Sequence, residues 1–222
     1  MTTIEIDPSR NPAALNAANR SRLYALLAQG FCFPSADFHR SLRDGLYRKG
    51  ICLLAEGLPY PLPIAAEGLV SSGGYVELQS EYIRLFEVGP KSRPPCPLYE
   101  GERRSGARMR IMEELVRFYE HFGLSLSTEE RELPDHLAVE LEFLHYLTFK
   151  EAAALAGRLD PGSYRKAEID FLDRHPAPYL SAMRAKIVDG HAEPPFEALT
   201  CVADDFLRAD LAFLRSLARP GM

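Results

Sequence analysis

The sequence predicts an all-α protein built as a single-domain helical bundle. Almost every apolar segment repeats with a spacing of three or four residues, which is the period of an amphipathic helix. No segment shows the sustained period-two alternation, or the paired turn residues, that predict strands and hairpins. A chain of 222 residues with 46% hydrophobic and 26% charged residues has an ordinary globular composition. We therefore expect one domain over residues 1–222.

The first third of the chain predicts short helices separated by turns. An apolar stripe stops near Gly30 and Pro34, which predicts the end of a first helix. The members of this stripe are Leu15, Ala18, Leu23, Leu26 and Leu27. Residues 37–55 are typical of one or two shorter helices, with Asp37 as the N-cap. Three prolines between residues 59 and 63 then predict a turn.

The next predicted helix follows Gly73 and Gly74 and leads into an irregular segment. Its apolar face consists of Tyr75, Leu78, Tyr82, Leu85 and Phe86. Four prolines between residues 90 and 97 block a helix, so we expect an irregular loop at about 88–106. A loop of this length inside a compact domain usually has a function.

The second half of the chain predicts further helices. Residues 112–122 form an amphipathic face that ends at Gly123, a typical C-cap. Pro134 suits the first position of the next helix, and residues 137–149 are apolar nearly all round, as expected in the middle of a bundle. Three more helices are predicted over residues 164–174, 179–188 and 195–218.

Charge and composition exclude several classes of partner. The formal net charge of -5 argues against nucleic acid as a ligand. The first residues lack the pattern of a secretory signal, and no run approaches the ~20 apolar residues that cross a bilayer, so we expect a cytoplasmic protein without stable membrane insertion. The four cysteines are far apart, which favours reduced thiols over a zinc or redox site.

Catalysis has no recognisable motif in this chain, and we expect neither an enzyme nor a bound cofactor. There is no nucleophile elbow, no phosphate-binding glycine loop and no dinucleotide fingerprint. One alternative is a helical metalloenzyme that uses Glu140, Glu142 and His145, because Glu142 and His145 have the Glu-x-x-His spacing of di-iron bundles. Such a bundle requires a second Glu-x-x-His, which is absent here.

A polar cluster at the head of the apolar helix allows two interpretations. Asp135, His136 and Glu140 stand close in sequence, and His136 and Glu140 are spaced for a hydrogen bond along the helix. They form either the mouth of a peptide-binding groove, or a helix-start cap with a satisfied core glutamate. The helix of Tyr82, Leu85 and Phe86 is likewise either core or the wall of an apolar groove.

Three segments of the chain resemble the TorD, DmsD and NarJ group of cytoplasmic maturation chaperones for molybdenum-dependent oxidoreductases. They are Tyr82-x-Arg84-Leu85-Phe86, the segment from Pro94 to Glu100, and Leu133-Pro134-Asp135-His136 followed by Glu140 to Leu144. The resemblance runs over roughly residues 17–217. It implies a helical bundle of the TorD/DmsD-like type.

The resemblance also implies a function. Members of this group bind the twin-arginine signal peptide of an apoenzyme and delay its export until the molybdopterin cofactor is inserted. The implied partner is the leader and catalytic subunit of a molybdopterin oxidoreductase, and a general interaction scaffold is the remaining alternative. The implied peptide-binding residues are Tyr82, Leu85, Phe86, Pro97, Tyr99, Pro134, Asp135, His136 and Glu140.

The chain departs from the group in two respects. Cys96 replaces a small hydroxyl residue, and the chain has no tryptophan, although tryptophans shape the site in some members. The Tyr99-Glu100-Gly101 continuation resembles chaperones of the enzymes for dimethyl sulfide, ethylbenzene or chlorate.

Overall fold

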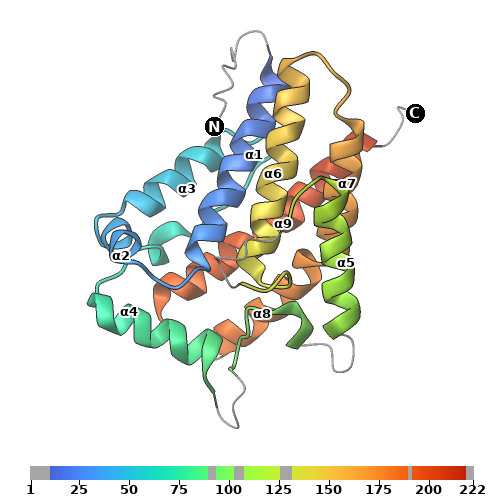
Figure 1. The fold of residues 1–222 in the computed structure, drawn as a ribbon. Helices are drawn as coiled ribbons and strands as arrows, with labels where there is room; N and C mark the ends of the chain where they lie inside the picture. Colours follow the sequence, from blue (N-terminus) through green and yellow to red (C-terminus); the bar gives the residue numbers. More distant parts are fainter. Residues whose placement is uncertain (1–10, 90–93, 103–107, 126–131, 190–191, 219–222) are drawn as a thin grey trace.

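The computed structural model describes residues 11–89, 94–102, 108–125, 132–189 and 192–218, and these ranges form an all-α fold (Figure 1). The α-helices are α1 (Pro12–Gly30), α2 (Ala36–Arg43), α3 (Leu46–Glu56), α4 (Tyr75–Tyr82), α5 (Arg108–His121), α6 (Leu137–Ala156), α7 (Gly162–Arg174), α8 (Pro176–Asp189) and α9 (Pro194–Ala218). Shorter helical turns are η1 (Ala66–Gly68), the π turn η2 (Ile83–Glu87) and η4 (Glu100–Glu102). Within these ranges the β pairing is limited to one isolated bridge between Tyr99 and His136. The predicted all-α class is confirmed.

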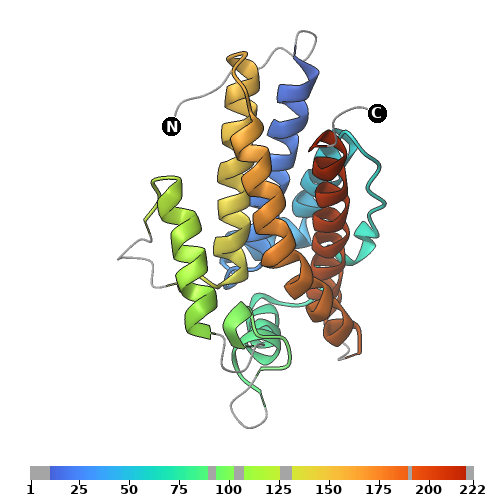
Figure 2. The ribbon, with the colours of Figure 1, turned by 90° about the vertical axis from the view of Figure 1, so that its right-hand side faces the viewer.

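Helices α1 and α6 form the centre of the bundle and run antiparallel side by side (Figures 1 and 2). The side chain of Asn11, at the start of α1, donates to the carbonyl of Leu155, near the end of α6, at 2.7 Å. Helices α7, α8 and α9 pack against one side of this pair, and α3 packs against α1. As predicted, the apolar helix after residue 137 occupies the middle of the bundle.

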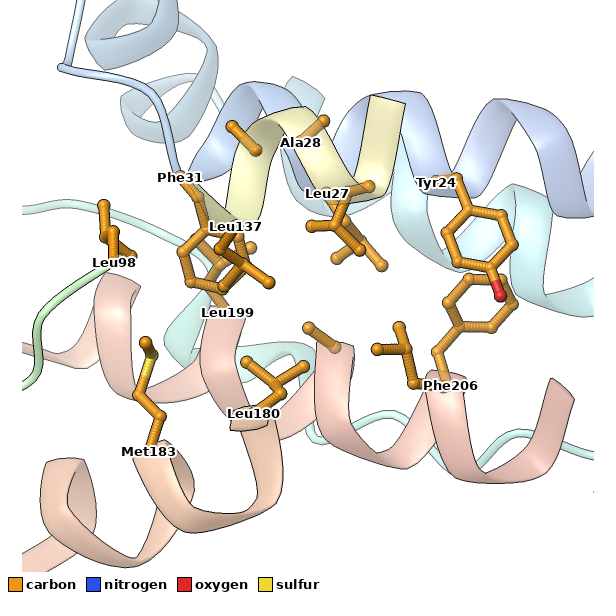
Figure 3. Close-up of a cluster of buried hydrophobic side chains, with 14 of the residues drawn as sticks. Tyr24, Leu27, Ala28, Phe31, Leu98, Leu137, Leu180, Met183, Leu199 and Phe206 are labelled. Atoms are coloured by element: carbon orange, nitrogen blue, oxygen red, sulfur yellow. The ribbon is translucent and has the colours of Figure 1, made fainter. Parts of the chain in front are cut away.

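The apolar core includes residues of every α-helix and, from the proline-rich segment, Cys96 and Leu98; Figure 3 shows part of it. Figure 3 shows side chains of α1, α6, α8 and α9 meeting in one cluster, with Leu98 inserted beside Phe31 and Leu137. Leu98 is only 2% exposed. The segment around Leu98 is therefore attached to the core by apolar burial, which stabilises its position.

A buried ionic cluster lies beside this apolar core. Arg20 of α1 is fully buried, and its guanidinium contacts Asp210 and Glu151 at 2.5 Å each and also pairs with Glu168. These carboxylates come from α9, α6 and α7, so one arginine connects four helices. Tyr24 donates a further hydrogen bond to Asp210 at 2.6 Å. Nothing in the sequence pattern predicted this cluster.

Three predicted helix boundaries were wrong. Helix α6 begins at Leu137 rather than at Pro134, because Pro134 and Asp135 form a turn, and His136 after them is extended and pairs with Tyr99. The N-cap of α2 is Ser35 rather than Asp37, since the Ser35 side chain accepts from Phe38 N at 3.1 Å. Helix α8 begins at Pro176, where the first-turn prolines remove no hydrogen bond that the helix could make.

Candidate functional site

The three segments that carry the family resemblance meet in space. Main-chain hydrogen bonds join them: Cys96 N to Leu85 O (2.9 Å), Leu137 N to Leu98 O (2.8 Å) and Glu100 N to Asp135 O (2.9 Å). We call residues 96–101 and 134–137, together with Leu85, the motif junction. The junction lies where the proline-rich segment crosses the start of α6.

The carboxylate of Asp135 holds the η4 turn within the motif junction. Its Oδ2 accepts a hydrogen bond from Gly101 N at 3.0 Å, and the Asp135 side chain is fully buried. A Cβ atom on Gly101 would lie only 2.8 Å from this oxygen. Glycine at residue 101 is therefore needed for the close approach of the turn to Asp135.

His136 serves as the cap of α6. Its Nδ1 accepts a hydrogen bond from Ala138 N at 3.2 Å, as an N-cap side chain does. Burial lowers the pKa of His136, although the negative charges of Glu132 and Asp135 act in the opposite direction. A neutral ring fits the acceptor role of Nδ1, so the capping interpretation holds for this residue.

Glu140 fits neither of the two interpretations of the polar cluster. It is fully buried, and neither carboxylate oxygen has a hydrogen-bond partner among the described residues. The expected side-chain bond to His136 is therefore not formed. Burial, together with the negative charges of Glu100 and Asp135, raises the pKa of Glu140 well above its ordinary value. Glu140 is thus favoured in its neutral form.

The apolar residues at the end of α4 and in η2 belong to the core and do not form a solvent-facing wall. Tyr82, Leu85 and Phe86 are each at most 3% exposed. The ring of Phe86 packs on Phe196 of α9 with centroids 5.4 Å apart, and the Tyr82 hydroxyl donates to the carbonyl of Phe31 at 3.0 Å. These contacts fix the end of α4 against α1 and α9.

Tyr99 differs from the other predicted peptide-binding residues because its side chain is partly exposed. Pro97 and Pro134 are buried, and their carbonyls accept hydrogen bonds from Tyr179 and Tyr119 respectively. The Tyr99 hydroxyl donates to the exposed Glu132 at 3.0 Å. Burial of part of the ring, with the nearby Glu132 charge, raises the pKa of Tyr99 to about 12.

A surface hollow of about 610 Å³ lies on the outer side of α4, and no sequence pattern predicted it. We call it the α4 hollow. Its apolar lining comes from α4, the preceding segment and the start of α9: Val70, Val76, Leu78, Pro194 and Pro195. Val76 is 68% exposed. The acidic residues of its lining are Glu77, Glu81 and Glu193. The same helix therefore presents aromatic residues to the core and an acid-edged apolar surface to solvent.

One acid of the α4 hollow is already engaged by an arginine. Arg84 binds Glu81 through two hydrogen bonds of 2.6 and 2.7 Å, and Glu193 N donates to the same carboxylate at 2.9 Å. Burial alone would raise the pKa of Glu81, but these hydrogen bonds outweigh it and lower the pKa. The hollow thus contains a carboxylate that binds a guanidinium in the bidentate geometry typical of arginine.

The alternative metal site is not formed by the residues that predicted it. His145 Nδ1 lies 3.0 Å from the carbonyl oxygen of Ser21 on α1, Glu142 is exposed, and Glu140 is buried at the motif junction. No group of histidine, cysteine or acidic residues suited to a metal ion occurs in the described ranges. Those ranges also hold no helix of the length and apolarity that a bilayer span requires.

Comparison with known proteins identifies relatives over most of the chain. Residues 66–185 match the family described as nitrate reductase delta subunit. A selenate reductase assembly chaperone protein of Thauera selenatis is 44% identical, over 80% of this chain and 78% of its own. A dimethyl sulfide dehydrogenase assembly chaperone protein of Rhodovulum sulfidophilum is 34% identical, over 86% and 78%. A perchlorate reductase assembly chaperone protein of Dechloromonas aromatica is 33% identical, over 86% and 88%.

Proposed function

Because the chain belongs to the nitrate reductase delta subunit family and is an assembly chaperone rather than an enzyme, we propose that it binds a twin-arginine leader. The leader belongs to the catalytic subunit of a molybdopterin oxidoreductase. The chaperone holds this apoenzyme in the cytoplasm and delays its export until the cofactor is inserted. Affinity and lifetime of the complex set the delay, since no bond is made or broken.

The α4 hollow is the observation that carries this proposal. A twin-arginine leader has cationic residues followed by an apolar stretch, and it needs carboxylates beside an apolar surface. The hollow supplies Val76, Pro194 and Pro195 for the apolar stretch, and Glu77 and Glu193 for the arginines. At about 610 Å³ it accommodates a few side chains, so it would bind part of the leader rather than the whole.

The motif junction supports the same proposal indirectly. The hydrogen bond from Cys96 N to the Leu85 carbonyl holds the η2 turn, and η2 continues directly from α4. The packing of Phe86 on Phe196 sets α4 against α9, and these helices supply two walls of the hollow. The buried motif residues would thus position the walls, while exposed residues contact the leader.

Titration calorimetry with a synthetic twin-arginine leader peptide tests the proposal. We expect a Kd below ~100 μM, which corresponds to a binding free energy more favourable than about -5.5 kcal/mol. Glu77→Gln with Glu193→Gln should weaken binding about tenfold, because two charge-assisted contacts to arginine are lost. Glu56→Gln with Glu120→Gln is a matched control, since both residues are exposed and lie outside the hollow.

The peptide itself supplies the second control. A leader with both arginines replaced by glutamine should bind at least tenfold more weakly. Equal affinity for the two peptides would indicate a general interaction scaffold without leader specificity. Absence of binding at ~100 μM of the arginine-containing peptide would reject the proposal.

A further inference from the structure

A second and larger hollow lies between α5 and α7, with a volume of about 860 Å³. Figure 2 shows α5, in green, standing beside the layer of α6 and α7. The two helices run antiparallel, because Phe122 lies near Tyr164 at one end and Arg174 pairs with Glu114 toward the other. One stripe of each helix lines the space, which we call the α5–α7 groove.

The floor of the α5–α7 groove is aromatic and firmly packed. Phe118 and Phe122 line it. Phe118 packs on Phe171 with ring centroids 5.2 Å apart, and Phe122 packs on Phe143 at 5.9 Å. Both side chains remain partly exposed. The groove therefore offers an apolar strip that is held by the core and available to solvent.

The lining of the α5–α7 groove has a positive net charge, whereas the lining of the α4 hollow has a negative one. Arg174 pairs with both Glu114 and Asp170, so its charge offsets one of these two negative charges. Arg110, Arg117 and Lys166 also line the groove and are exposed. Within the described ranges no ion pair joins these three cations to a carboxylate, and the lining as a whole holds four arginines and lysines against three acids, of which Glu113 is the third. The groove thus carries spare positive charge on a chain whose net charge is -5.

We propose that the α5–α7 groove docks an acidic amphipathic helix of the client enzyme, outside its leader. This inference rests on the proposed chaperone function. Arg110 and Arg117 are seven residues apart, which places them about 10 Å apart along the helix axis. Acids two turns apart on a docked helix have the same spacing and could pair with both arginines. An apolar strip flanked by cations fits a helix whose apolar face is bordered by acids.

The sign of the charge separates this groove from the leader site. A leader that begins with arginines would be repelled by Arg110, Arg117 and Lys166. An acidic helix would be repelled from the α4 hollow for the converse reason. The two surfaces therefore select different segments of one partner.

The groove is also continuous with the motif junction. His175, which follows α7, contacts Glu100 of the η4 turn through Nδ1 at 2.9 Å. Its Nε2 lies 3.5 Å from Glu114 in the groove lining. A segment docked on the groove thus lies two side chains from the turn that Asp135 holds. His175 therefore connects the α5–α7 groove to the motif junction.

Fluorescence anisotropy with a labelled three-turn helical peptide tests the docking proposal. The probe carries leucines on one face and glutamates on both borders of that face, and a matched peptide carries lysines in place of the glutamates. We expect the acidic peptide to bind the full chain, and the combined variant Arg110→Glu, Arg117→Glu and Lys166→Glu to weaken it at least tenfold. The lysine peptide should bind that variant more tightly than the wild type.

A control variant and the leader peptide make the outcomes distinct. Arg48→Glu, Lys49→Glu and Lys186→Glu change the net charge equally, at exposed residues of α3 and α8. They should leave acidic-peptide binding within twofold. The groove variant should bind the leader peptide as the wild type does. Loss of leader binding in both proteins would reject the leader proposal alone.

Three results would overturn the docking proposal. The first is no binding of the acidic peptide to the wild type. The second is binding that the groove variant does not weaken, or weakens no more than the control variant does. The third is full displacement of the peptide by a nucleoside monophosphate at equal concentration, which would identify a small-anion site instead.

Discussion

Replacing Glu140 by Met should stabilise the fold. Glu140 is fully buried, and its two carboxylate oxygens have no hydrogen-bond partner among the described residues. A buried polar group without a partner costs about 1–3 kcal/mol. Methionine is an unbranched apolar side chain that adapts to an irregular space and favours helix. At pH 5 we therefore expect the free energy of unfolding to rise by about 1–3 kcal/mol.

The gain should grow as the pH rises. The pKa of Glu140 is raised in the fold, so the folded chain keeps this proton above pH 4.5, where the unfolded chain releases it. The wild type therefore loses about 1.4 kcal/mol of stability per pH unit through this group, until the pH reaches the raised pKa. Glu140→Met removes this loss. The difference between the two proteins should be larger at pH 7 than at pH 5.

Urea denaturation at pH 5, 6 and 7, followed by far-UV circular dichroism, measures both effects. For a chain of this length each 1 kcal/mol shifts the Tm by about 2–4 °C, so calorimetry provides an independent readout. A lower stability of Glu140→Met at pH 5 would mean that the carboxyl group makes a hydrogen bond. A difference that does not change with pH would mean that Glu140 is ionised in the fold.

Three further predictions concern the ionic cluster and the motif junction. Burial raises the pKa of Glu168 to about 8, so the wild type should lose stability as the pH rises from about 4.5 toward 8. In urea denaturation, Glu168→Gln should reduce this dependence of the unfolding free energy on pH. An unchanged dependence would contradict the raised pKa of Glu168. Arg20→Ala should cost about 3–5 kcal/mol of unfolding free energy, because it leaves buried carboxylates without their cation, and a loss under 1 kcal/mol would refute that role. Gly101→Ala should lower the Tm, because the new Cβ would lie 2.8 Å from Asp135 Oδ2. The control Gly157→Ala has no contact under 3.4 Å and should change stability by less than ~1 kcal/mol. Equal Tm values for the two variants would show that the motif junction tolerates the extra atom.

Helical periodicity predicted the elements of the fold well, because local spacing and core burial agree. The stripe that ends at Gly30 became α1, and the last predicted helix became α9 with nearly the same bounds. The start of α6 was mispredicted because a tertiary contact decides it. The pairing of Tyr99 with His136 keeps His136 extended directly before the helix, and no local preference of Pro134 reveals that partner.

The Arg20 cluster could not be predicted for a related reason. Arg20 contacts Glu151, Glu168 and Asp210, which are 131 to 190 residues away in the sequence. Each of these residues alone resembles an ordinary surface charge on an amphipathic helix. Their convergence depends on how four helices are rotated about their axes, and apolar periodicity sets that rotation only coarsely.

The sequence predicted the candidate site as nine peptide-binding residues, and eight of these are buried, the exception being Tyr99. The three motif segments do meet, yet Tyr82, Asp135 and Glu140 are buried. A sequence motif does not distinguish a residue that contacts a ligand from a residue that positions the neighbouring backbone. The α4 hollow was missed because its walls come from α4, residues 70–73 and the start of α9, which are far apart in the sequence.

The burial of the motif residues changes how mutations in them must be interpreted. Replacing Asp135 and His136 by Ala removes the hydrogen bond to Gly101 N and the N-cap of α6, and a lost cap alone costs about 0.5–2 kcal/mol. Weaker leader binding in such a variant would follow from a displaced η4 turn as readily as from a lost contact. The side chains of Glu77 and Arg117 are exposed instead. Substitutions at these exposed positions, with unchanged stability, therefore locate the binding surfaces more directly than substitutions in the motifs.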